Sequence, residues 1–146
     1  MKYQIRRIQF INSLTLKALV IDSEKEGISF VSNTVEEWIT GINRFDKKGE
    51  IFFGAFINAE IVGMGGLNID PYTNLSSIGR VRHLYVCPKF RRQNIGKQLM
   101  LKIIKHAKKN YQGIRLYTEN KEAFKFYESL GFQNSSKFKE SHFLKL

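Results

Sequence analysis

The 146-residue sequence has little of what several common kinds of protein require. Its single cysteine, Cys87, excludes an internal disulfide framework and a cysteine-rich zinc site, so we expect no metal. No run approaches about 18 apolar residues, which excludes a transmembrane helix and a membrane partner. The N-terminal residues alternate like a strand and lack the apolar stretch of a signal peptide, so we expect a cytoplasmic protein. Since there are only two prolines, no repeat and no Pro/Ser-rich linker, we expect residues 1–146 to form one domain.

Acidic side chains are scarce in the second half of the chain. Residues 79–146 carry 16 basic and 4 acidic side chains, whereas residues 1–78 carry 8 basic and 9 acidic ones. The whole chain therefore has a formal net charge of +11, almost all of it in the second half. Such asymmetry indicates a nucleic acid or a phosphate-bearing ligand, unless the lysines simply form the solvated face of a helix.

The hydrophobic pattern predicts a mostly antiparallel sheet followed by one βαβ crossover. We expect strands over residues 3–8, 51–57, 61–69, 81–86, 114–118, 132–138 and 142–146, and helices over residues 12–24, 34–41, 95–109 and 120–130. Thr34 and Glu37 have the capping-box form at the start of the second helix. Asn120 is the expected N-cap of the last helix, and Gly131 is expected just after its end.

The stretch before the third predicted helix suits a ligand that carries phosphates. A helix N-terminus offers unpaired N–H donors and a partial positive charge. Gly96 lets a ligand approach the backbone, Asn94 tolerates a left-handed conformation, and the side chains of Arg91, Arg92 and Lys97 add full charges. Because the stretch matches neither of the two common glycine-rich phosphate loops, a solvated helix start remains the alternative.

Three motifs in this region resemble those of the GNAT superfamily, the acyl-CoA-dependent N-acyltransferases. Arg91-Arg92-Gln93-Asn94-Ile95-Gly96 is similar to its Arg/Gln-x-x-Gly-x-Gly/Ala loop, with Asn94 in place of the first glycine. Two further segments of this chain resemble the flanking motifs of the family. They are Leu84-Tyr85-Val86-x-Pro88 and Asn120-x-x-Ala123-x-x-Phe126-Tyr127-Glu128-x-Leu130-Gly131-Phe132. The resemblance implies an α/β (α+β) GNAT fold. This fold has a single twisted mixed sheet of about seven strands and about four helices, and it opens between the strands at Leu84 and Ile114.

The resemblance also implies acetyl-CoA (coenzyme A) as the donor and assigns roles to particular residues. The backbone of residues 84–86 would bind the pantetheine arm and polarise the thioester carbonyl, the loop N–H groups would hold the pyrophosphate, and Asn120 would contact either region. The implied cofactor-binding residues are Leu84, Tyr85, Val86, Arg91, Arg92, Gln93, Asn94, Ile95, Gly96, Lys97 and Asn120. Tyr127 would protonate the departing thiolate, unless it merely packs its helix on the sheet.

The general base and the acceptor site are less well defined. His83 is the titratable group nearest the expected thioester, but strand alternation puts it on the face opposite Arg82 and Leu84. A structural histidine and a water chain as base are the alternatives. Trp38, Asp70 and Tyr72 are candidate acceptor-binding residues, with packing by Trp38 and a plain turn around Pro71 as the alternatives.

The sequence therefore predicts an N-acetyltransferase in which a primary amine attacks acetyl-CoA directly in a ternary complex. We expect a small amine or an amino-acid-like metabolite as acceptor, ahead of a protein N-terminus or lysine, and a homodimer is compatible with this prediction. One alternative is a GNAT-fold protein that binds acyl-CoA without catalysis. The other is a basic nucleic-acid-binding module, which would leave the three ordered motifs as coincidence.

Overall fold

The computed structural model describes residues 2–146. They contain one seven-stranded sheet, whose strands lie in the order β1-β2-β3-β4-β5-β7-β6. The seven strands and four α-helices agree in number with the prediction. In chain order the elements are β1 (Gln4–Arg7), α1 (Lys17–Lys25), α2 (Phe30–Thr40), β2 (Ile51–Ile57), β3 (Glu60–Ile69), β4 (Ile78–Val86), a 3₁₀ turn (Pro88–Phe90), α3 (Ile95–Lys108), β5 (Gly113–Leu116), α4 (Lys121–Ser129), β6 (Gln133–Asn134) and β7 (His142–Lys145).

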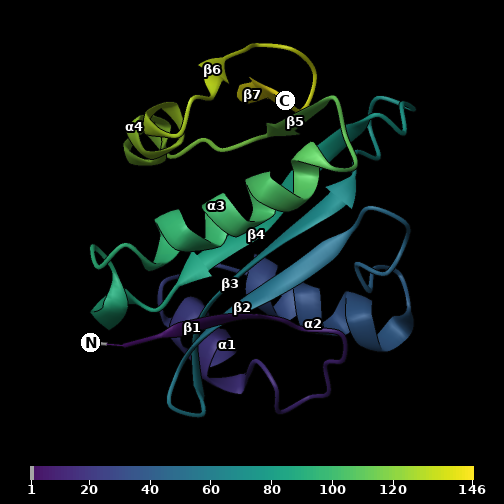
Figure 1. The fold of residues 1–146 in the computed structure, drawn as a ribbon. Coiled ribbons are helices and arrows are strands. Elements are labelled where there is room, and N and C mark those ends of the chain that lie inside the picture. Colours follow the sequence, from purple (N-terminus) through teal and green to yellow (C-terminus); the bar gives the residue numbers. More distant parts are fainter. Residues whose placement is uncertain (1) are drawn as a thin grey trace.

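Helices cover both faces of the sheet. Figure 1 shows α3 lying across one face, while α1 and α2 lie on the other. Each face has its own apolar cluster because α3 is amphipathic and because α1 and α2 pack on β3 and β4. The apolar residues Ile95, Leu99, Ile103 and Ala107 of α3 are buried, and its lysines are exposed. None of the helices in residues 2–146 has the length and apolar character that a membrane span needs.

The sheet opens between β4 and β5. These strands are parallel, but they pair only through Ile78–Arg80 and Gly113–Arg115, whereas the remaining strand pairs are antiparallel. Beyond Arg80, the edge of β4 that faces β5 has no strand partner within residues 2–146. This unpaired edge leaves backbone N–H and C=O groups free along the opening.

A bulge in β4 changes which side chains face the opening. Both His83 and Leu84 lie opposite Gly65 of β3, and His83 has a φ of 62°. As a result Arg82 and His83 both face the α2 side, while Val81 and Leu84 pack on the α3 side. The prediction that strand alternation separates His83 from Arg82 is wrong, because the extra residue interrupts the alternation.

Two helix starts also differ from the prediction. α2 begins at Phe30, one turn before Thr34, so the capping-box assignment to Thr34 and Glu37 is wrong. The Thr34 hydroxyl instead donates to the Phe30 carbonyl at 2.8 Å from within the helix. α1 begins at Lys17, but the predicted start at Asn12 forms a turn in which its side-chain oxygen accepts from the N–H groups of residues 14 and 15.

Candidate active site

The opening between β4 and β5 contains a cavity of about 370 Å³. Both predicted catalytic residues, His83 and Tyr127, line it together, and so does Tyr72. The full lining consists of Phe30, Tyr72, Arg80, Val81, Arg82, His83, Leu84, Leu116, Tyr117, Thr118, Tyr127 and Lys139. The start of α2, β4, the end of β5, α4 and three loops therefore converge on one space.

Tyr127 reaches the cavity from α4. The helix starts where predicted, because the Asn120 side chain accepts from the Glu122 N–H at 3.0 Å, and it ends before Gly131, whose φ is 100°. Tyr127 is buried, and its hydroxyl has no hydrogen-bond partner within residues 2–146. Burial raises the pKa of Tyr127 to about 12, so the phenol keeps its proton across the physiological range.

His83 is held on the α2 side of the same cavity. Its Nδ1 lies 2.6 Å from the Thr34 hydroxyl oxygen, and its ring stacks on Phe30 with centroids 5.8 Å apart. Burial, with a smaller contribution from the neighbouring Arg82 charge, lowers the pKa of His83 to about 3. The imidazole is therefore neutral at physiological pH and is a weak proton acceptor.

The loop that leads from β4 into α3 presents a run of free backbone donors. The six successive N–H groups from Arg92 to Lys97 make no hydrogen bond to residues 2–146; the first N–H of α3 to be paired is that of Gln98. Arg92 and Asn94 have φ values of 62° and 68°, so the predicted left-handed conformation of Asn94 is confirmed. Successive N–H groups at a helix start, next to left-handed residues, form an anion-binding concavity.

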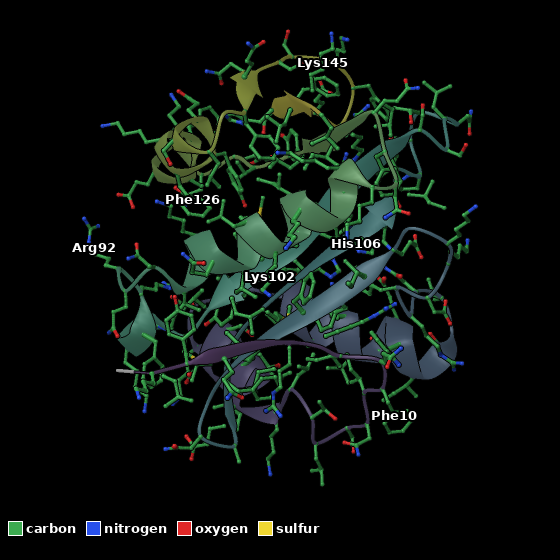
Figure 2. The ribbon with its side chains drawn as sticks, in the orientation of Figure 1. Phe10, Arg92, Lys102, His106, Phe126 and Lys145 are labelled. Atoms are coloured by element: carbon green, nitrogen blue, oxygen red, sulfur yellow. The ribbon has the colours of Figure 1, made fainter. Side chains whose placement is uncertain are left out.

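Two of the predicted loop cations differ in what surrounds them. In Figure 2 the Arg92 side chain extends from the loop into solvent. The Arg91 guanidinium instead forms two 2.8 Å hydrogen bonds with Glu26 at the end of α1, and its Nε donates to the Val86 carbonyl. Glu26 also accepts from the Tyr85 hydroxyl at 2.7 Å, and its hydrogen bonds with Arg91 are the main reason that its pKa is lowered. The Arg91 charge is thus largely neutralised within the protein.

Sequence reasoning missed Glu26, because nothing in the pattern links it to a loop 65 residues further along the chain. It also missed Arg82 and Lys139 as lining residues of the cavity. The signal for Arg82 was present, since it lies in the strand that leads to the phosphate-binding loop. Lys139 lies in a loop whose path only the folded structure defines.

The predicted acceptor residue Asp70 does not reach the cavity surface. Its side chain is fully buried, 3.3 Å from Arg80 and 3.7 Å from Arg115. Arg115 also lies 3.4 Å from the buried Glu140. Two carboxylates and two guanidinium groups thus form a compensated network beneath the opening, and Asp70 has no free face toward an amine.

Trp38 and Tyr72 lie in different surroundings. Trp38 is buried on the α2 side of the sheet, where it packs against Phe45 and Phe52 away from the cavity. Tyr72 is 43% exposed at the rim of the cavity, with the Arg80 guanidinium 4.8 Å from its ring centroid. Of the three candidate acceptor residues, the structure therefore brings only Tyr72 to the cavity.

Comparisons with known proteins agree with this arrangement. A family model for the acetyltransferase (GNAT) domain matches residues 48–134. An uncharacterized N-acetyltransferase of Methanocaldococcus jannaschii is 33% identical over 87 residues, which are 56% of this chain. The match spans only 38% of that archaeal protein's length.

Solved structures share the whole fold. The crystal structure of a protein assigned as an acetyltransferase from an Exiguobacterium species superposes with a TM-score of 0.88 at 29% identity, covering 99% of this chain and 94% of that one. The PaiA N-acetyltransferase of Thermoplasma acidophilum, solved in complex with coenzyme A, gives a TM-score of 0.73 at 23% identity and covers 100% of both chains.

The protein is an α/β protein whose mixed sheet opens between β4 and β5, with a row of free backbone N–H groups in the loop that follows β4. This arrangement suits an elongated anionic ligand. The family model covers more than half of the chain, so the chain belongs to the GNAT acetyltransferase superfamily. The predicted resemblance and the predicted GNAT fold are confirmed.

Proposed function

We propose that this chain transfers the acetyl group of acetyl-CoA to the primary amine of a small molecule, by direct attack in a ternary complex. The observation that carries the proposal is the run of six free backbone N–H groups from Arg92 to Lys97, at the end of the opening that contains Tyr127. If the start of α3 were merely solvated and Tyr127 merely packed its helix on the sheet, there would be no reason for both to lie at the same opening. Family membership supports the same reaction.

The residues fit the donor along the whole opening. The six loop donors suit the pyrophosphate, and Gly96 leaves its approach free of a side chain. The free edge of β4 from Leu84 to Val86 offers strand-like hydrogen bonds to the pantetheine amides. Acetyl-CoA supplies an activated acetyl thioester, which we propose lies beside Tyr127.

Tyr127 is the proposed general acid. The amine nitrogen forms a bond to the acetyl carbon, the carbon–sulfur bond breaks, and the phenol of Tyr127 gives its proton to the departing thiolate. An N–H group of the β4 edge near Val86 polarises the acetyl carbonyl. The pKa of Tyr127, about 12, keeps the acid protonated between turnovers.

The proposed base is water rather than a side chain. His83 lies at the cavity but, with a pKa of about 3, would accept only a small fraction of the amine protons at neutral pH. Among residues 2–146, no carboxylate lines the cavity. A water chain leading to solvent can take the proton, so we expect kcat/KM to rise with pH until the acceptor amine is mostly neutral.

A panel of primary amines, assayed with acetyl-CoA by release of the CoA thiol, tests the proposal. We expect release with some small amines, and an increase in the unfolding temperature with CoA that corresponds to about 2.7 kcal/mol at 100 times Kd. Stabilisation by CoA without thiol release would favour the non-catalytic alternative. Steeply salt-dependent binding to RNA or DNA without a CoA effect would favour the nucleic-acid module.

A further inference from the structure

Cationic side chains dominate the charge of the proposed acceptor cavity. Of the twelve residues that line it, Arg80, Arg82 and Lys139 are basic and none is acidic. An acceptor with a second ammonium group would therefore meet like charges there. A polyamine or a lysine side chain in a basic peptide is such an acceptor.

Two carboxylates beneath the opening are already engaged. Asp70 and Glu140 are buried, and both face Arg115, while Asp70 also pairs with Arg80. These four groups balance one another, so neither carboxylate neutralises the remaining cations of the cavity. Those remaining cations are Arg82 and Lys139.

Arg82 forms no ion pair and no hydrogen bond within residues 2–146, although it is only partly exposed. The β4 bulge places it on the same side as His83, which is neutral. Arg82 also lines a neighbouring cavity with Glu37, Asp46 and Glu50, but it forms no ion pair with any of these carboxylates. Arg82 and Val86 lie opposite Gly66 and Gly63 of β3, so about 10 Å of strand separates Arg82 from the residue that precedes the phosphate-binding loop region. An anion at Arg82 would therefore not be the pyrophosphate of the donor.

Lys139 completes a cationic rim around Tyr72. Its Nζ lies 5.8 Å from the Tyr72 ring centroid, while the Arg80 guanidinium lies 4.8 Å from the same ring. Lys139 has no carboxylate within ion-pair distance in residues 2–146. The cavity lining thus includes two unpaired cations, one on β4 and one in the loop before β7.

We propose that the acceptor amine also carries an anionic group, a carboxylate or a phosphate, which Arg82 and Lys139 bind. This inference rests on the proposed function and specifies its substrate class. The same charges favour the neutral form of the amine, because a nearby cation disfavours an ammonium group. The cations that bind the anionic group of the acceptor would therefore also lower the pKa of its amine.

Matched amine pairs test the proposal directly. Leucine is compared with leucinamide and phosphoethanolamine with ethanolamine, with spermidine as the polycationic amine, and thiol release from acetyl-CoA is measured. We expect kcat/KM for at least one anionic member to exceed that of its uncharged partner by about tenfold, and spermidine to be the poorest acceptor. The pair with the larger ratio identifies the anionic group. Equal rates within both pairs, or a preference for spermidine, would overturn the inference.

Variants locate the binding site. We expect Arg82→Gln to raise KM for the anionic amine about tenfold with kcat within about twofold, and Arg82→Lys to restore part of the affinity. Lys139→Gln should have a smaller effect in the same direction. Lys137→Gln is the matched control, since Lys137 is exposed in the same loop but does not line the cavity. Loss of CoA affinity in Arg82→Gln would assign Arg82 to the donor instead, and contradict the proposal.

A binding measurement separates this inference from the proposed reaction. Calorimetric titration of the CoA-loaded protein with N-acetylleucine, N-acetylleucinamide, and the N-acetyl derivatives of phosphoethanolamine and ethanolamine requires no turnover. Tighter binding of an anionic compound to the wild type but not to Arg82→Gln supports the anion site even if no amine in the panel releases thiol. Equal binding within both pairs contradicts the anion site even if acetyl transfer occurs.

Discussion

The two ends of the opening provide positive potential by different means. At the α3 end the hydrogen-bond donors are six backbone N–H groups, while the Arg92 side chain extends into solvent and the Arg91 guanidinium is neutralised by Glu26. At the cavity end the positive groups are the unpaired side chains of Arg82 and Lys139. Backbone N–H groups are present whatever the side chains are, so they suit the pyrophosphate, which every acyl-CoA molecule has. Side chains, in contrast, can differ between proteins that use different acceptors.

The largest expected effect is at the cavity end. Tyr127→Phe removes the hydroxyl and leaves the packing of a buried ring unchanged, so we expect turnover to fall by at least about tenfold with little change in CoA affinity. Steady-state kinetics and CoA titration measure the two quantities. The pKa of Tyr127, about 12, predicts that its loss of a proton does not lower the wild-type rate below about pH 10.

Tyr111→Phe is the matched control for this variant. Tyr111 is also buried and its hydroxyl lacks a hydrogen-bond partner within residues 2–146, but it lies outside the cavity. Its replacement should leave turnover unchanged. If Tyr127→Phe retained the full rate over the whole pH range, Tyr127 would not be the acid.

The contrast between the two ends also explains what could be predicted from the sequence. The loop was predictable because its geometry is local: Asn94 and Gly96 are within two residues of each other, and the left-handed conformation of Asn94 follows from its side chain. The cavity end was not, because a bulge moved His83 to the face of Arg82, and a buried network removed Asp70 from the acceptor. Bulges and ion pairs between distant strands leave no periodic signal in a sequence.

His83 gives the next largest effect, and it is one of stability. The pKa of His83 is about 3 in the folded state, below its ordinary value of 6.5. Between these two pH values the unfolded state therefore binds a proton that the folded state does not bind. The neutral imidazole therefore contributes stability above pH 6.5 that is lost as the pH falls toward 3, by up to about 3 kcal/mol at pH 4.

His83→Asn removes this titration and retains a residue that tolerates the φ of 62°. Urea unfolding at pH 7 and pH 4 should show a smaller loss of stability in the variant than in the wild type. An equal loss in both proteins would mean that the pKa of His83 in the folded state is close to its ordinary value. His83 would then again be a candidate base.

Gly96→Ala tests the backbone donors of the α3 end. A Cβ there would be 3.7 Å from Phe126 and 3.8 Å from Val86, which are ordinary contacts, so the protein itself accommodates alanine. We expect an unchanged or slightly higher unfolding temperature, because alanine favours helix, and CoA affinity about tenfold lower, because the ligand loses its close approach. The control is Asn94→Gly, which keeps the left-handed backbone and should bind CoA within about twofold of the wild type. Unchanged affinity in Gly96→Ala would mean that the phosphates do not contact this part of the loop.

The smallest effect distinguishes a positioning role of Arg91 from a direct contact with phosphate. Arg91 and Glu26 are 43% and 27% exposed at the side chain, so breaking their ion pair should cost less than about 1 kcal/mol of stability. If Arg91 mainly holds the loop against α1, Glu26→Gln and Arg91→Gln should each weaken CoA binding by about two- to threefold, and the double variant should be no weaker than either single one. Calorimetric CoA titration of the three variants completes the cycle. A loss beyond tenfold in Arg91→Gln alone, with Glu26→Gln unchanged or tighter, would show that the guanidinium binds the phosphates itself, and the two ends of the opening would then both rely on side-chain charge.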